Sequence, residues 1–254
     1  MSNFDFILIC LGSVAGGAAN ALAGGGTIIT FPLLTAMGIP AMAANITNTV
    51  ALTPGYFGAT IAQLKNLRGQ APWLQVFIPT SILGGIMGGI LLLKAGEQVF
   101  RLLVPFLILF GTLLIAIQHS LQTWLTSSRD KRKTKRAMWA ILLILPSAVY
   151  GGYFGAGVSV IVLAALGFMR NDSLTRLNAL KQVIAFSINC ATAVFFIFSG
   201  QVVWSAAAVI AAGALAGGAL GGALAGWIQE IVLRRIMVAI GFCVSLIYFL
   251  RFAT

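Results

Sequence analysis

Long apolar runs alternate with short polar connections along the whole chain. Two shorter apolar runs, about 26–38 and 156–168, each follow a glycine cluster and are too short to cross a bilayer as regular helices. We interpret them as half-helices or re-entrant segments. Crossing the hydrocarbon core takes about 20 apolar residues, and the runs of about that length lie at about 4–22, 41–63, 73–93, 98–118, 137–154, 180–199, 202–226 and 230–252.

The pattern is repeated within the chain. Segments 24–26 and 69–73 recur as 155–157 and 200–204 at an offset of 131, and segments 84–89 and 97–101 recur as 217–222 and 230–234 at an offset of 133. Four matches in the same order indicate two homologous halves, as in many transporter folds. We expect a first transmembrane repeat in residues 1–123, a basic linker in 124–136 and a second transmembrane repeat in 137–254. Each repeat would hold about four full transmembrane helices and one short broken helix after its glycine-rich break.

Composition supports an all-α integral membrane protein. Of the 254 residues 59% are hydrophobic and 8% are charged, whereas about a quarter of the residues are charged in ordinary soluble domains. The net charge of +11 would suggest nucleic acid in a soluble protein, but here the Lys and Arg residues lie in short loops, where they set orientation. We therefore expect the lipid bilayer as the partner of this surface, and no nucleic acid.

The loop charges favour inverted halves. With the linker in the cytoplasm, four crossings per half place 9 basic residues inside and 7 outside, whereas five crossings per half place 13 inside and 3 outside. Five crossings invert the second half relative to the first and leave both termini outside. The sequence thus predicts a multi-pass protein with inverted repeats and a cytoplasmic linker.

The two glycine clusters are the first candidate for chemistry. Adjacent glycines at membrane depth unwind a helix and let backbone N–H groups approach a ligand. A half-helix beginning at Thr27 or Val158 would point its positive N-terminal end at that ligand, and paired breaks in two halves mark substrate sites in transporters. The alternative is that the small residues only let helices pack closely, which we favour for segments 84–89 and 217–222.

A polar stripe follows each short segment, at i, i+3 and i+4 spacing on one helical face. The first stripe is Asn45, Asn48 and Thr49, and the second is Asn178, Lys181 and Gln182. Because no acidic residue lies at comparable depth in an apolar run, we expect an anionic substrate to supply the counter-ion of Lys181. The alternatives are snorkelling of Lys181 to the interface and interhelical hydrogen bonding by the amides.

Enzymatic and metal-binding motifs are missing from the sequence. No metalloprotease, nucleophile-elbow or phosphate-loop motif occurs, and Cys10, Cys190 and Cys243 lie in apolar runs without metal-ligand spacing. We therefore expect neither an enzyme nor a metal or other cofactor.

The glycine break followed by the segment 27–34, the segment 43–49 and the duplicated second half together resemble the TauE/SafE family of membrane permeases. The resemblance covers nearly the whole chain. It implies a secondary transporter of the bacterial inner membrane that moves small sulfur-containing anions such as sulfite, thiosulfate, sulfoacetate or other organosulfonates. The second half departs from the pattern, since it has Leu163 where the first half has Pro32.

These inferences predict a carrier that binds a small anion near the bilayer midplane and moves it across the membrane by alternating access. We also expect a second copy of the chain as a partner in a homodimer. A passive anion channel and a non-transporting assembly partner remain the alternatives. The expected substrate-binding residues are Gly24, Gly25, Gly26, Thr27, Asn45, Asn48, Thr49, Gly155, Gly157, Val158, Ser159, Asn178, Lys181 and Gln182.

Overall fold

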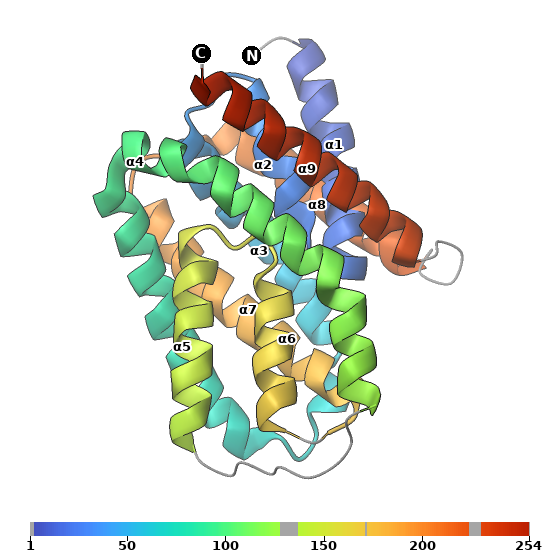
Figure 1. The fold of residues 1–254 in the computed structure, drawn as a ribbon. Coiled ribbons are helices and arrows are strands. Elements are labelled where there is room, and N and C mark those ends of the chain that lie inside the picture. The colour runs from blue at the N-terminus through green and yellow to red at the C-terminus, as the bar shows by residue number, and fades with distance from the viewer. Residues whose placement is uncertain (1–2, 128–136, 171, 224–229, 254) are drawn as a thin grey trace.

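The computed structural model describes residues 3–127, 137–170, 172–223 and 230–253, and within these ranges it is all-helical, as predicted (Figure 1). Two helical segments, Ala71–Trp124 and Leu174–Ile197, are long and apolar enough to cross a membrane. The elements are α1 (Asn3–Ala23), α2 (Gly26–Ala36), α3 (Ala41–Ala62), the 3₁₀ turn η1 (Leu64–Leu67), α4 (Ala71–Ser127), α5 (Ala137–Tyr153), α6 (Val158–Met169), α7 (Leu174–Ile197), α8 (Trp204–Ala223) and α9 (Glu230–Ala253).

Both glycine clusters interrupt the helical chain. Gly24, Gly155 and Gly157 have φ angles of +73°, +80° and +74°, a region that residues with a Cβ atom adopt only with strain. The short helices α2 and α6 begin directly after these turns, close to the expected starts at Thr27 and Val158.

The expected boundary between the apolar runs 73–93 and 98–118 is present as a sharp bend. Both runs lie within α4, whose backbone is not helical at Gly96, where φ is +74° and ψ is +171°. The bend divides α4 into a first part before Gly96 and a second part after it (Figure 1).

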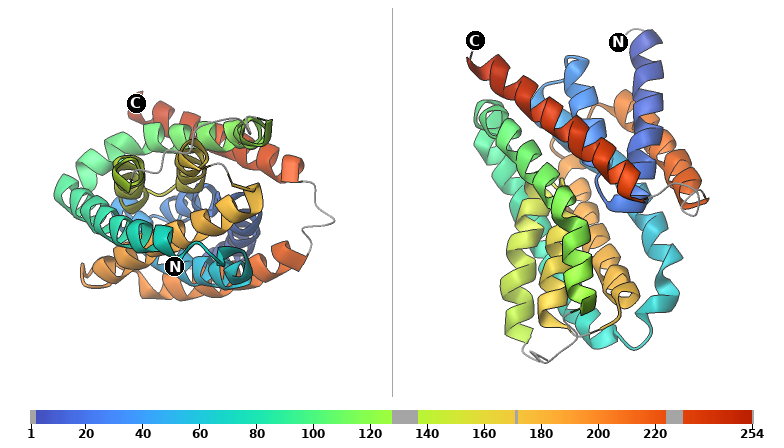
Figure 2. Two further views of the ribbon diagram at one scale, coloured as in Figure 1. Left: turned by 90° about the horizontal axis from the view of Figure 1, so that it is seen from below. Right: turned by 45° about the vertical axis from the view of Figure 1, so that its right-hand side comes forward.

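The chain termini lie at one end of the molecule, which we call the terminal end (Figure 1). The end of α4 and the start of α5 lie at the opposite end, here called the linker end, as do the end of α3 and the start of α7 (Figures 1 and 2). On one face, α9 packs across the second part of α4 (Figure 2).

Glycines bring two helix pairs into backbone contact. Helix α5 packs on the first part of α4, where a Cβ on Gly88 would lie 2.2 Å from the carbonyl oxygen of Val149. Helix α8 packs on α1, where a Cβ on Gly217 would lie 1.9 Å from the carbonyl oxygen of Val14. Real Cβ atoms do not approach other atoms so closely. The predicted small-residue packing of segments 84–89 and 217–222 is thus confirmed at these glycines.

An aromatic cluster fixes α2 against the second glycine cluster. The ring of Phe31 in α2 meets the ring of Phe154, which precedes Gly155, edge to face at a centroid distance of 5.4 Å. Phe100 in α4 completes the cluster, with centroids 6.3 Å from Phe31 and 6.2 Å from Phe154. All three rings are buried, and edge-to-face aromatic pairs add about 0.5–1.5 kcal/mol beyond their buried area.

Replacement of Gly88 by alanine tests the backbone contact between α4 and α5. We expect Gly88→Ala to destabilise the fold by about 1–3 kcal/mol, because the new methyl group displaces the α5 backbone. In Gly58→Ala, the matched control, the new Cβ meets no atom within 4 Å, and the higher helix propensity of alanine should stabilise the fold by up to about 1 kcal/mol. Thermal unfolding in detergent measures both, and equal melting temperatures would contradict the packing analysis.

Candidate functional site

The two glycine breaks meet inside the protein. A Cβ on Gly24 would lie 2.9 Å from both Cβ and Oγ of Ser159, the second residue of α6. Gly24 directly precedes the N-terminal turn of α2, so the first turns of both short helices lie beside one spot. Each first turn leaves backbone N–H groups without helical partners and carries the positive end of the helix dipole.

Not every N–H group of the breaks is open to a ligand. The N–H of Gly24 donates to the carbonyl of Asn20 at 3.0 Å, and the N–H groups of Gly155 and Val158 donate to the carbonyls of Tyr150 and Gly155, both at 3.2 Å. Among the described residues, helix geometry leaves the first-turn N–H groups of Gly26, Thr27 and Ser159 as donors for a ligand. These three residues are buried.

Asn48 and two threonines form a buried polar cluster beside the start of α2. The Nδ2 atom of Asn48 donates to Oγ1 of Thr27 at 3.4 Å, and the hydroxyl of Thr30 lies 2.5 Å from Oδ1 of Asn48. Asn48 is 1% exposed. The cluster therefore holds the Thr27 side chain in place at the end of α2 that carries the open N–H groups.

Asn45 connects the first half to the second break. Its Nδ2 atom donates to the carbonyl of Tyr153 at 2.9 Å, while its Oδ1 atom is buried without a partner in the described part of the chain. The third residue of this stripe, Thr49, bonds the carbonyl of Asn45 one turn earlier in α3 at 2.9 Å. Asn45 thus positions the second break, the hydrogen-bonding role that we gave as the alternative to ligand binding.

The polar stripe of the second half lies on α7. Gln182 is buried on α7 and lines a cavity between α1, α3 and α8, and its backbone carbonyl lies 3.4 Å from the Thr60 hydroxyl. Asn178 and Lys181 are half-buried on the same helix. Among the described contacts, Gln182 therefore has other neighbours than Asn45 and Asn48.

Two polar residues near the breaks, Thr30 and Asn20, are not among the expected substrate-binding residues. Thr30 belongs to the cluster of Asn48, and Asn20 lies one helical turn before Gly24, with a buried Oδ1 atom that has no partner among the described residues. A signal for Asn20 exists in the sequence, because it is an amide late in an otherwise apolar run and four residues before the glycines.

The family model described as "Sulfite exporter TauE/SafE" matches residues 8–248. The chain belongs to this family. This confirms the resemblance drawn from the glycine breaks and the duplication.

Similar proteins of the TauE/SafE family bear general names. A "Probable membrane transporter protein" of Haemophilus influenzae is 27% identical over 209 residues, which cover 82% of this chain and 80% of the relative. The "Probable membrane transporter protein ORF9" of Sinorhizobium sp is 25% identical, over 78% of this chain and 74% of the relative. The "Probable membrane transporter protein YfcA" of Escherichia coli K12 is 23% identical, over 78% and 72%. No solved structure matches significantly.

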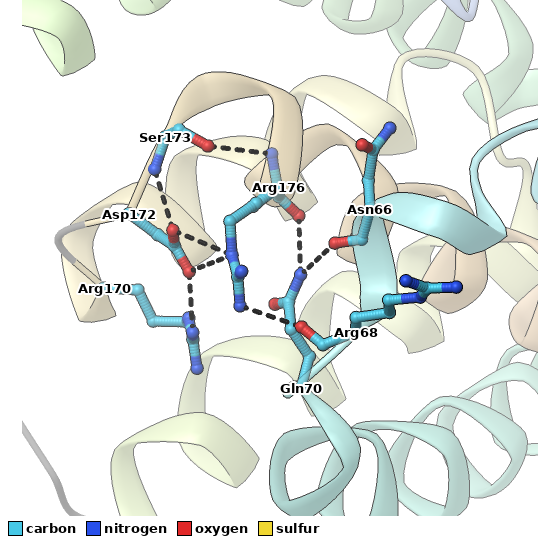
Figure 3. Close-up of polar contacts among 7 residues, drawn as sticks. All are labelled: Asn66, Arg68, Gln70, Arg170, Asp172, Ser173 and Arg176. Atoms are coloured by element: carbon cyan, nitrogen blue, oxygen red, sulfur yellow. Dashed lines mark hydrogen bonds and ion pairs between the residues drawn. The ribbon is translucent and has the colours of Figure 1, made fainter.

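A second polar group of this TauE/SafE protein lies at the linker end and connects its two halves (Figure 3). Arg176 at the start of α7 bonds Asp172 at 3.1 Å and donates to the carbonyl of Arg68, which follows η1, at 3.2 Å. Arg170 bonds the same carboxylate at 2.9 Å and lies over the ring of Trp73 in α4. We call Arg68, Arg170, Asp172 and Arg176 the linker-end cluster.

The linker-end cluster keeps Asp172 ionised. Burial alone would raise the pKa of the Asp172 carboxyl, but the hydrogen bond from Arg170, the N–H of Ser173 and the charge of Arg176 outweigh it and hold that pKa below its usual value. A cap residue also starts α7, because Oγ of Ser173 accepts a hydrogen bond from the N–H of Arg176.

Replacement of Asp172 by asparagine tests the linker-end cluster. A carboxyl with a depressed pKa in the folded state stabilises the fold above its unfolded pKa and loses this effect as pH falls through its folded pKa. We therefore expect Asp172→Asn to lower stability by about 1 kcal/mol at pH 7, with the difference from wild type shrinking below about pH 4. Chemical unfolding across pH measures this. A difference independent of pH would contradict the ion pairing.

Proposed function

We propose that this TauE/SafE protein is a secondary transporter that moves small sulfur-containing anions across the bacterial inner membrane by alternating access. The carrying observation is the contact of Gly24 with Ser159, which brings the first turns of two broken helices to one buried spot. Such helix starts favour anions through their open N–H groups and dipoles, and discontinuous helices line the substrate sites of many secondary transporters.

Packing between the halves supports the inverted arrangement within this proposal. Helix α1 packs on α8, and its counterpart α5 packs on the first part of α4, the counterpart of α8. Helix α3 packs on its own counterpart, α7. Exchanging the halves therefore leaves these contacts unchanged. Helix α1 also runs away from the terminal end, whereas α5 runs towards it (Figure 1), as an inverted pair would.

The donors beside the contact suit an oxyanion. The first-turn N–H groups of Gly26, Thr27 and Ser159 and the hydroxyl of Ser159 can each donate to one oxygen of a sulfite, thiosulfate or sulfonate group. Hydrogen bonds to charged groups stabilise by about 1.5–3 kcal/mol each. Lys181 would add positive charge from α7 as the anion passes. The description of the family supports a sulfur-containing anion as the substrate.

The distribution of basic residues gives the orientation within this proposal. The linker with its six basic residues lies in the cytoplasm, and the terminal end faces the opposite side. The linker end is then the cytoplasmic end. The breaks would lie between the cytoplasm and the compartment on the other side of the membrane.

Anion flux into proteoliposomes tests the proposed function. We expect the wild type to exchange sulfite, thiosulfate or sulfoacetate, and Ser159→Ala to weaken the apparent affinity by about tenfold or more, because one donor to a charged oxygen is lost. Ser147→Ala is the matched control, since this buried serine on α5 bonds the carbonyl of Leu143 within its own helix at 2.7 Å.

Counter-flow separates a carrier from a channel. Unlabelled anion inside the vesicles should accelerate uptake of labelled anion in a carrier and should not do so in a passive channel. No flux of any of these anions in the wild type would overturn the proposal, and equal losses in Ser159→Ala and Ser147→Ala would remove the contact of the breaks as the site.

A further inference from the structure

A cavity of about 450 Å³ lies between the two halves, within the size range of small-molecule sites. Helices α1 and α3 of the first half and α7 and α8 of the second half form its walls. It extends from Ala62 and Gln63, where α3 ends at the linker end, to Asn20 on α1. The residues that line it in the described part of the chain are uncharged.

Three glycines of the cavity wall have no packing reason to be glycine. A Cβ on Gly55 or Gly58 would meet no atom within 4 Å, and one on Gly218 would approach another atom only at 3.9 Å. A glycine in a helix costs about 1 kcal/mol relative to alanine. At Gly88 and Gly217 close backbone contact explains this cost, whereas at Gly55 and Gly58 the missing side chains only keep the cavity wide.

The inner end of the cavity reaches the proposed binding site. Asn20 lines the cavity and is 8% exposed. A Cβ on Gly26, the first residue of α2, would lie 2.9 Å from the Cβ of Asn20, so the amide stands directly beside the open helix start. Its Oδ1 atom is buried and has no partner among the described residues. Gln182 adds a second amide to the wall from α7.

We propose that this cavity is the aqueous passage through which the anion travels between the linker end and the start of α2, with Asn20 as the amide that it meets before the helix N-termini. This inference rests on the proposed function and adds the route that the anion takes through the protein. The wall consists of small and apolar residues with the amides of Asn20, Gln63 and Gln182. Because it is uncharged, it leaves room for a hydrated oxyanion without binding it tightly, which lets the ion leave again. The passage fits a compact anion of the size of sulfite or thiosulfate better than a bulky one.

Thiol labelling tests the passage without relying on transport. In a variant with Cys10, Cys190 and Cys243 replaced by serine, we expect a cysteine in Gly58→Cys to react with a negatively charged, membrane-impermeant thiosulfonate added at the linker side. Leu83→Cys is the matched control on α4, because Leu83 is 61% exposed on the outer surface, which faces lipid in the membrane, and should react only with a lipophilic maleimide. Reaction of Gly58→Cys with the maleimide alone would identify a lipid-filled groove and overturn the passage.

Flux through a narrowed cavity gives the second readout. We expect Gly58→Leu to reduce anion flux by about tenfold or more while Gly58→Ala keeps most of it, because the larger side chain fills the open space beside α8. Gly58→Leu should retain the wild-type melting temperature, which separates a blocked passage from a misfolded protein.

The outcomes distinguish the two proposals. Wild-type flux together with unchanged flux in Gly58→Leu would overturn the passage and leave the transport function standing. No flux of any tested anion in the wild type would overturn the transport function and the passage with it.

Discussion

Backbone polar groups that a helix break exposes must find partners inside the protein, because the bilayer core offers none. This constraint governs the fold. The turns at Gly24 and Gly155 are half-buried, and carbonyls one turn earlier satisfy some of their N–H groups. Asn45 and the ring of Phe31 hold the second break from α3 and α2. The first half thus supplies contacts that hold the break of the second half.

Glycine has three structural roles in this chain, and composition alone does not distinguish them. At Gly24 it permits a positive φ angle, and at Gly88 it admits the backbone of a neighbouring helix. At Gly58 the helix is regular and the surroundings are open, so the residue preserves space. Substitution by alanine should therefore act differently at the three positions. It should strain the backbone at Gly24, overpack the contact at Gly88 and modestly stabilise the fold at Gly58.

The sequence predicts much of the fold because apolar run length and glycine clusters report local properties. The starts of α2 and α6 follow from the break glycines, and the family is recognised from the same motifs. The site is less accessible, because helical spacing places residues on a face without saying what the face contacts. Thr49 and Gln182 occupy matching positions in the two stripes, yet Thr49 bonds the carbonyl of Asn45 in its own helix and Gln182 lines the cavity. Asn20 matters only through its proximity to Gly26, which tertiary structure decides.

The nature of the contacts between the halves determines where the molecule can rearrange. Separating α4 from α5, or α1 from α8, would uncover glycine backbones in close contact and leave voids that no other side chain fills. The linker-end cluster differs, because Arg176 contacts the first half through the carbonyl of Arg68, which water can replace at a cost of about 1 kcal/mol. The glycine-packed pairs therefore behave as units. In the proposed transport cycle, movement that exposes the breaks to one side would fall on the polar contacts between α7 and η1, which cost less to open than the glycine contacts.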